Sequence, residues 1–209
     1  MEIERIVVSP VEANCYVVVC PETREAAVID PGWPDTRILW AIEDHEAQVK
    51  IILNTHAHWD HIGGNAELKR LTNAPIALHQ ADMLLLKMKG GAPLMGFDIE
   101  ASPKPDLWLE HGQTVSVGRL NLEVLYTPGH APGHVAFFEA TQGVVFSGDA
   151  LFRGSIGRTD LPGGKFETLQ ASIREQLNTL PHEVLVYCGH GPETTIGEEK
   201  RHNPFVRPA

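Results

Sequence analysis

The chain has 209 residues, of which 43% are hydrophobic and 21% charged, an ordinary composition for a globular protein with a sizeable core. Its formal net charge of -10 disfavours nucleic acid and anionic membranes as partners, and the sequence shows neither an apolar run of ~18 residues nor a signal peptide. The three sparse cysteines fit a reducing compartment, so the chain is expected to be cytoplasmic. Its length predicts a single domain over residues 1–209, and a monomer or small homo-oligomer is expected.

Strand and helix patterns alternate along the chain. Short turn sequences such as CPETRE separate the first strands, which favours antiparallel neighbours. Two groups of strands that alternate with helices predict an α/β fold of two packed sheets with helices outside. The predicted elements, in chain order, are strands 3–9, 15–20 and 25–30, helix 36–47, strand 50–55, helix 64–71, strand 75–79, helix 81–89, a Pro- and Gly-rich loop at 90–106, strands 114–118, 122–127, 134–140 and 143–149, helix 166–180 and strand 183–189.

Histidines and aspartates gather in loops that directly follow predicted strands. These loops are NTHAHWDH after KIIL, TPGH after LEVLY, SGDALF after GVVF and CGHGPE after EVLVY. Loops at the strand ends of a rigid scaffold commonly carry active groups. If the two sheets bring these loops to one edge, their imidazole and carboxylate groups would form a metal site.

The densest of these loops holds four titratable side chains, His56, His58, Asp60 and His61. His56 and His58 are two positions apart, so they point the same way on an extended segment, whereas Asp60 and His61 come after the chain has begun to turn. A lone histidine usually fills a surface or core position, but four buried ionisable groups are costly unless a cation neutralises them. Imidazole and carboxylate ligands suit Zn²⁺, and iron or manganese also accept them.

Four segments carry a resemblance to a known family: THAHWDHIGGN, YTPGHAPGHVAFF, FSGDALFRGSIGRTDLPGG and YCGHGPETTIGEEKRHNPF. They resemble the metallo-β-lactamase superfamily and, within it, the glyoxalase II-like thioester hydrolases of the short, single-domain bacterial type. The resemblance implies an αβ/βα four-layer sandwich of two mixed β-sheets flanked by helices. It also implies two divalent metal ions, usually zinc with iron or manganese as alternatives. The implied ligands are His56, His58 and His130 for the first ion, Asp60, His61 and His190 for the second, and Asp149 as a bridge between both.

The same resemblance implies the reaction. A hydroxide shared by two cations roughly 3.5–4 Å apart would attack the carbonyl of a small thioester, S-lactoylglutathione in a hydroxyacylglutathione hydrolase. Asp60 and Asp149 would be the catalytic carboxylates, because they offset the metal charge and Asp60 has an oxygen that can orient the hydroxide. The nearest alternative is a persulfide dioxygenase, which shares this fold and holds a single iron with two histidines and an aspartate.

Further residues have supporting roles in this resemblance. Asp30 in VIDPG is expected to hydrogen-bond the ligand loop, and His134 is expected to support the site without ligating. Arg158 falls where glyoxalase II proteins carry a basic residue that binds the glycine carboxylate of glutathione, although a purely structural arginine fits equally well. Asp160 and Pro192 replace tyrosines that contact glutathione in longer enzymes, and no separate C-terminal helical glutathione-binding domain is expected. Substrate recognition should therefore be looser.

Other activities of the superfamily fit the sequence less well. Flavodiiron carriers replace the second histidine of the cluster by glutamate, and His58 argues against them. β-Lactamases are usually exported and generally use cysteine at the position of Asp149. Nucleases need a cap domain and a basic face, and a non-catalytic module tends to lose some ligand positions. The remaining conspicuous side chains are expected to be core filling (Cys188), packed under the ligand loop (Trp59), local hydrogen bonders (His79 and His111) or exposed (His45, His182 and His202).

Overall fold

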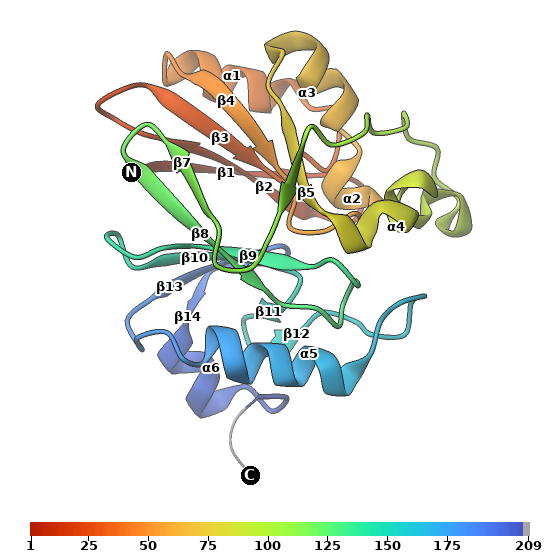
Figure 1. Ribbon diagram of the computed structural model, residues 1–209, viewed down its shortest axis with the longest axis vertical. Helices are drawn as coiled ribbons and strands as arrows, with labels where there is room; N and C mark the ends of the chain where they lie inside the picture. The colour runs from red at the N-terminus through yellow and green to blue at the C-terminus, as the bar shows by residue number, and fades with distance from the viewer. Residues whose placement is uncertain (207–209) are drawn as a thin grey trace.

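Two six-stranded β-sheets pack face to face in the computed structural model, which describes residues 1–206 (Figure 1). The last three residues of the predicted single domain, 207–209, lie outside the described residues. The first sheet has the order β1-β2-β3-β4-β5-β6; it is antiparallel from β1 to β3, as the turn sequences predict, and parallel from β3 to β6. Its strands are β1 (Glu2–Val8), β2 (Ala13–Val19), β3 (Glu25–Ile29), β4 (Gln48–Leu53), β5 (Ile76–His79) and β6 (Leu107–Leu109).

The second sheet has the order β14-β13-β10-β9-β8-β7 and is antiparallel except between β10 and β13. A two-stranded ribbon of β11 and β12 follows β10 in the chain. The strands are β7 (Thr114–Val117), β8 (Leu120–Tyr126), β9 (Val135–Glu139), β10 (Val144–Gly148), β11 (Leu151–Phe152), β12 (Ser155–Ile156), β13 (Leu185–Cys188) and β14 (Thr194–Thr195).

Helices cover the outer face of each sheet. α1 and α3 pack on the first sheet, and α5 and α6 pack on the second (Figure 1). The predicted αβ/βα sandwich of two mixed sheets is therefore confirmed. No helix within residues 1–206 is both long and apolar enough to cross a membrane. The helices are α1 (Thr36–Asp44), α2 (Trp59–Ile62), α3 (Asn65–Thr72), α4 (Met83–Lys87), α5 (Phe166–Ser172) and α6 (Ile196–His202), with 3-10 helices at Gln80–Asp82 and Lys89–Met95 and a π-helical turn at Ile173–Leu177.

The main core lies between the two sheets. β2 is buried along its whole length because its alternating side chains face two cores. Val18 belongs to the core cluster between the sheets, together with Phe137 and Phe146, whereas Val17 belongs to the cluster that includes residues of α1. A strand buried on both faces needs a continuous apolar run instead of alternation. Full burial of one such side chain contributes roughly 1.5–3 kcal/mol, so this core holds the strand ends in place.

Several predicted elements end elsewhere than expected. Predicted helix 36–47 ends at Asp44, and predicted helix 166–180 ends with the π-helical turn at Leu177. Predicted helix 81–89 divides into a 3-10 helix and α4. The predicted loop 90–106 is in part a 3-10 helix, interrupted where Gly90 and Gly91 have positive φ. β6, β11, β12, β14 and α6 were not predicted, because their apolar runs are too short to show a periodicity.

The histidines outside the ligand loops behave mostly as predicted. One prediction is wrong: His45 is half-buried, because its ring lies between the carboxylates of Glu2 and Glu4. The other predictions for isolated histidines are confirmed: His79 accepts a hydrogen bond from the Ala81 N–H, His111 accepts one from the Tyr126 N–H, and His182 and His202 are exposed.

Candidate metal centre

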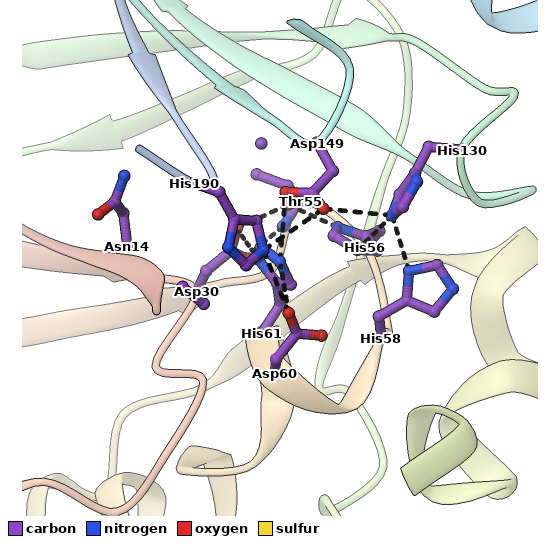
Figure 2. Close-up of polar contacts among 12 residues, drawn as sticks. Asn14, Asp30, Thr55, His56, His58, Asp60, His61, His130, Asp149 and His190 are labelled. Atoms are coloured by element: carbon purple, nitrogen blue, oxygen red, sulfur yellow. Dashed lines mark hydrogen bonds and ion pairs between the residues drawn. The ribbon is translucent and has the colours of Figure 1, made fainter. Parts of the chain in front are cut away.

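Four loops meet at one edge of the sandwich, each directly after a strand. They follow β4, β8, β10 and β13, and the first of them runs into the single turn of α2. Figure 2 shows that their polar side chains point toward a common centre. All seven predicted ligands lie on these loops or on α2: His56, His58, Asp60, His61, His130, Asp149 and His190.

Three imidazoles form the first group of donors. The Nε2 atom of His130 lies 2.8 Å from Nδ1 of His58 and 3.2 Å from Nε2 of His56. All three rings are buried. Burial lowers the pKa of His56 well below its usual value and the pKa of His58 to about 3. These rings are therefore neutral at pH 7, the form in which imidazole binds a metal.

Asp60, His61 and His190 form the second group, and Asp149 lies between the two groups. Oδ2 of Asp60 is 3.2 Å from Nε2 of His190 and 3.6 Å from Nε2 of His61. Asp149 places Oδ1 3.3 Å from Nε2 of His61, and Oδ2 3.4 Å from Nε2 of His130. One carboxylate thus faces a histidine of each group.

Two atoms of this cluster, Nε2 of His61 and Oδ1 of Asp149, are buried without a well-formed hydrogen bond to any described residue, although they lie 3.3 Å from each other. Unpaired buried polar atoms are costly and call for an explanation, such as an ion between them. The donor set, imidazoles with two carboxylates in compact groups, is the one that borderline divalent cations favour. The residues therefore fit a histidine-rich metal centre.

The outward nitrogens of His130 and His190 are held by backbone carbonyls. Nδ1 of His130 donates to the carbonyl of Arg158 at 2.7 Å, and Nδ1 of His190 donates to the carbonyl of Val11 at 3.2 Å. A carbonyl oxygen can only accept a hydrogen bond, so each ring carries a proton on Nδ1. The neutral ring of His130 consequently presents the lone pair of Nε2 to the centre. Burial lowers the pKa of His190, but its hydrogen bond to Asp60 and the attraction of Asp149 outweigh burial and raise it, so His190 presents a lone pair after it loses its Nε2 proton.

Asp30 connects two of the predicted ligands. Its Oδ2 accepts from Nδ1 of His61 at 3.0 Å and from the Thr55 hydroxyl at 2.6 Å, and its Oδ1 accepts from the Thr55 N–H at 2.7 Å. Because the Thr55 hydroxyl donates to Asp30, it accepts from Nδ1 of His56, 3.0 Å away. Asp30 thereby orients His61 directly and His56 through Thr55.

His134 lies beside the ring of His56, but its nitrogens face elsewhere. Its Nε2 accepts from the Asp149 N–H at 3.0 Å, and its Nδ1 contacts the Thr127 hydroxyl at 2.8 Å. His134 thus holds the backbone of Asp149. Cys188 lies in the apolar cluster beneath α5, where burial raises the pKa of its thiol to about 12.

Asp82, which no sequence pattern marks as a site residue, joins two of the ligand loops. Its buried carboxylate accepts from the Ala57 N–H at 2.8 Å and from the Gly133 N–H at 2.5 Å. Ala57 lies between two predicted ligands, and Gly133 lies in the loop after β8. Burial raises the pKa of Asp82 to about 6. An aspartate near a helix start usually indicates a cap, so no sequence signal pointed to this role.

Metal binding is expected to displace a proton from the centre. Burial disfavours the charged ring of His61, but the attraction of Asp149, Asp60 and Asp30 outweighs burial and raises its pKa well above the usual value. The metal-free protein therefore carries this proton at pH 7, and metal affinity should rise with pH. Calorimetric titration with ZnCl₂ in buffers of different ionisation enthalpy should show release of about one proton or more per chain. Heats that are independent of the buffer would contradict this expectation.

A cavity of about 650 Å³ opens onto the centre, and His130, Asp149 and Arg158 are among the residues that line it. The guanidinium of Arg158 pairs with Asp160 through two contacts, Nε to Oδ1 and Nη2 to Oδ2, each 2.7 Å long. These hydrogen bonds lower the pKa of Asp160 to about 2, so its carboxylate is charged at neutral pH. Arg158 thus lies at the cavity with two of its donor atoms already engaged.

A two-sheet sandwich with a histidine-rich candidate metal centre at its edge is typical of one class of metal-dependent enzymes. The sequence pattern of the metallo-β-lactamase superfamily matches residues 8–190, and the chain belongs to this superfamily. The superfamily predicted from the sequence is therefore confirmed.

Proteins similar to this chain carry names of different activities. The hydroxyacylglutathione hydrolase GloC of Haemophilus influenzae is 39% identical over 209 residues, which cover 99% of this chain and 98% of GloC. Among solved structures, the B3 metallo-β-lactamase BLEG-1 has a TM-score of 0.92 at 36% identity, with 98% of this chain and 99% of that chain covered. The structure of TTHA1623 in a di-iron-bound form has a TM-score of 0.89 at 40% identity, and the match covers 97% of this chain and 100% of TTHA1623.

Proposed function

We propose that the protein is a dinuclear metal-dependent hydrolase of small thioesters, with S-lactoylglutathione as its expected substrate. The observation that carries this proposal is the position of Asp149, whose two oxygens face a histidine of each donor group. The similarity to a named hydroxyacylglutathione hydrolase supports the thioester class. The proposed ligands are His56, His58 and His130 for one ion, Asp60, His61 and His190 for the other, and Asp149 for both. Zinc is the proposed metal, with iron and manganese as alternatives.

The chain's own groups would prepare the reaction. Two divalent cations at this centre would supply a water of lowered pKa and an electrophile that polarises a carbonyl. Asp60 makes its contacts with His61 and His190 through Oδ2. Its other oxygen, Oδ1, is proposed to accept a hydrogen bond from the attacking water, since Asp60 lines the cavity. A thiolate is a good leaving group, so no general acid is required of the chain. Arg158 is proposed to contact a substrate carboxylate. Its guanidinium would then divide its hydrogen bonds between that carboxylate and Asp160.

The test combines metal analysis with one assay. Purified protein should contain close to two ions per chain and hydrolyse S-lactoylglutathione. Chelation should abolish the activity, and returning the metal should restore it. A protein that holds two ions but cleaves no thioester would refute the proposal.

Two competing activities are separated by parallel assays. One tightly held iron with oxygen uptake on glutathione persulfide would instead support the persulfide dioxygenase. The similarity to BLEG-1 makes a β-lactam substrate the second comparison. Nitrocefin hydrolysis that exceeds thioester hydrolysis would favour that activity.

A further inference from the structure

One wall of the cavity is apolar and open to solvent. α4, the 3-10 helix after it and the residue between them contribute Leu84, Met88, Leu94 and Met95 to the cavity lining, and these four residues form what we call the apolar wall. The side chains of Leu84 and Leu94 are each 71% exposed. Exposed apolar side chains that gather next to a site indicate a ligand-binding surface. His58 lines the same cavity, so the apolar wall is continuous with the metal centre.

The apolar wall is fixed to the loop that carries the predicted ligands. Phe97, which follows it in the chain, stacks on Trp59 with ring centroids 4.3 Å apart. Gly90, between its two halves, lies so close to this loop that an added Cβ would be 2.2 Å from the Trp59 nitrogen. Because Trp59 directly follows His58, the wall has a set position relative to the centre. A chain bound along it would lead to the reacting atoms.

Away from the metal centre, the cavity offers few positive charges to a charged substrate. Among the described residues that line it, Arg158 is the one lysine or arginine, and Asp160 already engages two of its donor atoms. Glutathione brings two carboxylates, and the protein's net charge of -10 adds a general repulsion. Away from the metal centre, apolar contact is therefore the larger contribution that this cavity can make to substrate binding.

We propose that the preferred substrates are thioesters with an apolar acyl chain, which lies along the apolar wall while the carbonyl is at the metal centre. This inference rests on the proposed thioester hydrolysis and refines its acyl class: S-lactoylglutathione, whose acyl group is short and polar, would be hydrolysed but not preferred. Full burial of one methylene raises binding affinity roughly fourfold. Because an open wall covers the acyl chain on one side only, we expect affinity to rise about twofold for each added methylene. The value of kcat/KM should therefore rise about tenfold or more from S-butanoylglutathione to S-octanoylglutathione.

The test measures this series in three proteins. The wild type should show the tenfold rise, and the double variant L84Q/L94Q should reduce it to less than about threefold. Leu71→Gln is the matched control, because Leu71 is 55% exposed on α3 and does not line the cavity. That control should keep the wild-type dependence. A wild type without chain-length dependence, or a dependence that persists in L84Q/L94Q, would overturn the inference.

Binding of non-hydrolysable compounds separates this inference from the proposed function. S-octylglutathione should bind the zinc-loaded wild type at least about tenfold more tightly than S-methylglutathione, and L84Q/L94Q should lose most of that difference. If this holds while no thioester is cleaved, the recognition of an apolar chain stands and the proposed hydrolysis fails. Equal affinities of the two compounds overturn the inference even in an active hydrolase.

Discussion

Replacing Asp149 by alanine is expected to release both metal ions and to lower kcat/KM for a thioester by roughly a thousandfold or more. Asp149 faces both donor groups, with Oδ1 3.3 Å from His61 and Oδ2 3.4 Å from His130. Its removal also deprives the buried imidazolium of His61 of a partner, which disfavours the geometry that a metal needs. Metal content by mass spectrometry and the rate of S-lactoylglutathione hydrolysis measure the two effects.

Two histidine variants serve as controls for this prediction. His134→Ala should keep both ions and lose only about tenfold in rate, because His134 holds the Asp149 backbone N–H instead of facing the centre. His182→Ala should change neither property, since His182 is exposed and does not line the cavity. Equal loss of metal from Asp149→Ala and His134→Ala would show that the proposed ligand set is wrong.

The second large effect is expected at Gly90. This residue has a φ of +62°, and an added Cβ would lie 2.2 Å from the Trp59 nitrogen and 2.6 Å from the Ala57 carbonyl oxygen. The left-handed conformation costs about 1–2 kcal/mol for a residue with a Cβ, and displacing the packed backbone costs about 1–3 kcal/mol more. Gly90→Ala should therefore lower the free energy of unfolding by about 2–5 kcal/mol. Urea unfolding of the metal-free protein measures this change.

Gly91 provides a matched control for Gly90. It also has a positive φ, +80°, but a Cβ added there would meet nothing within 4 Å. Gly91→Ala should lose only the conformational contribution of about 1–2 kcal/mol and keep its metal affinity. Gly90→Ala should also bind metal more weakly, because the displaced backbone flanks His58. If both variants unfolded at the same urea concentration, the close contact of Gly90 with the ligand loop would make no contribution to the free energy of unfolding.

The layered fold was predictable because apolar patterning determines which faces can pack. The run CYVVVC predicts a strand, and the strand β2, Ala13–Val19, is buried at every position. The ends of α1 and of the predicted helix 166–180 were not predictable to the residue, because capping and packing decide where a helix stops. Residues 90–106 read as a loop from their proline and glycine content, whereas the stacking of Phe97 on Trp59, which no local pattern reveals, orders part of this segment.

The candidate site was predictable to different degrees. The residues from His56 to His61 stand out because four ligating side chains share one short loop. His130, Asp149 and His190 are inconspicuous alone and were predicted from their places after strands and from the family resemblance. Asp82 could not be predicted, because its partners contribute backbone N–H groups that nearly every residue has. The pairing of Arg158 with Asp160 depends on side-chain rotamers, which a sequence does not specify.

The spacing of the proposed ligands along the chain bears on how the protein matures. A growing polypeptide has the first donor set, with the bridging carboxylate, once Asp149 has been synthesised. The second set waits for His190, whose backbone forms an isolated bridge with Ala13 near the opposite terminus. On the proposed assignment, the second position can be filled only when the two ends of the chain have come together, as the bond from the Asn14 side-chain amide to the Gly191 carbonyl also requires.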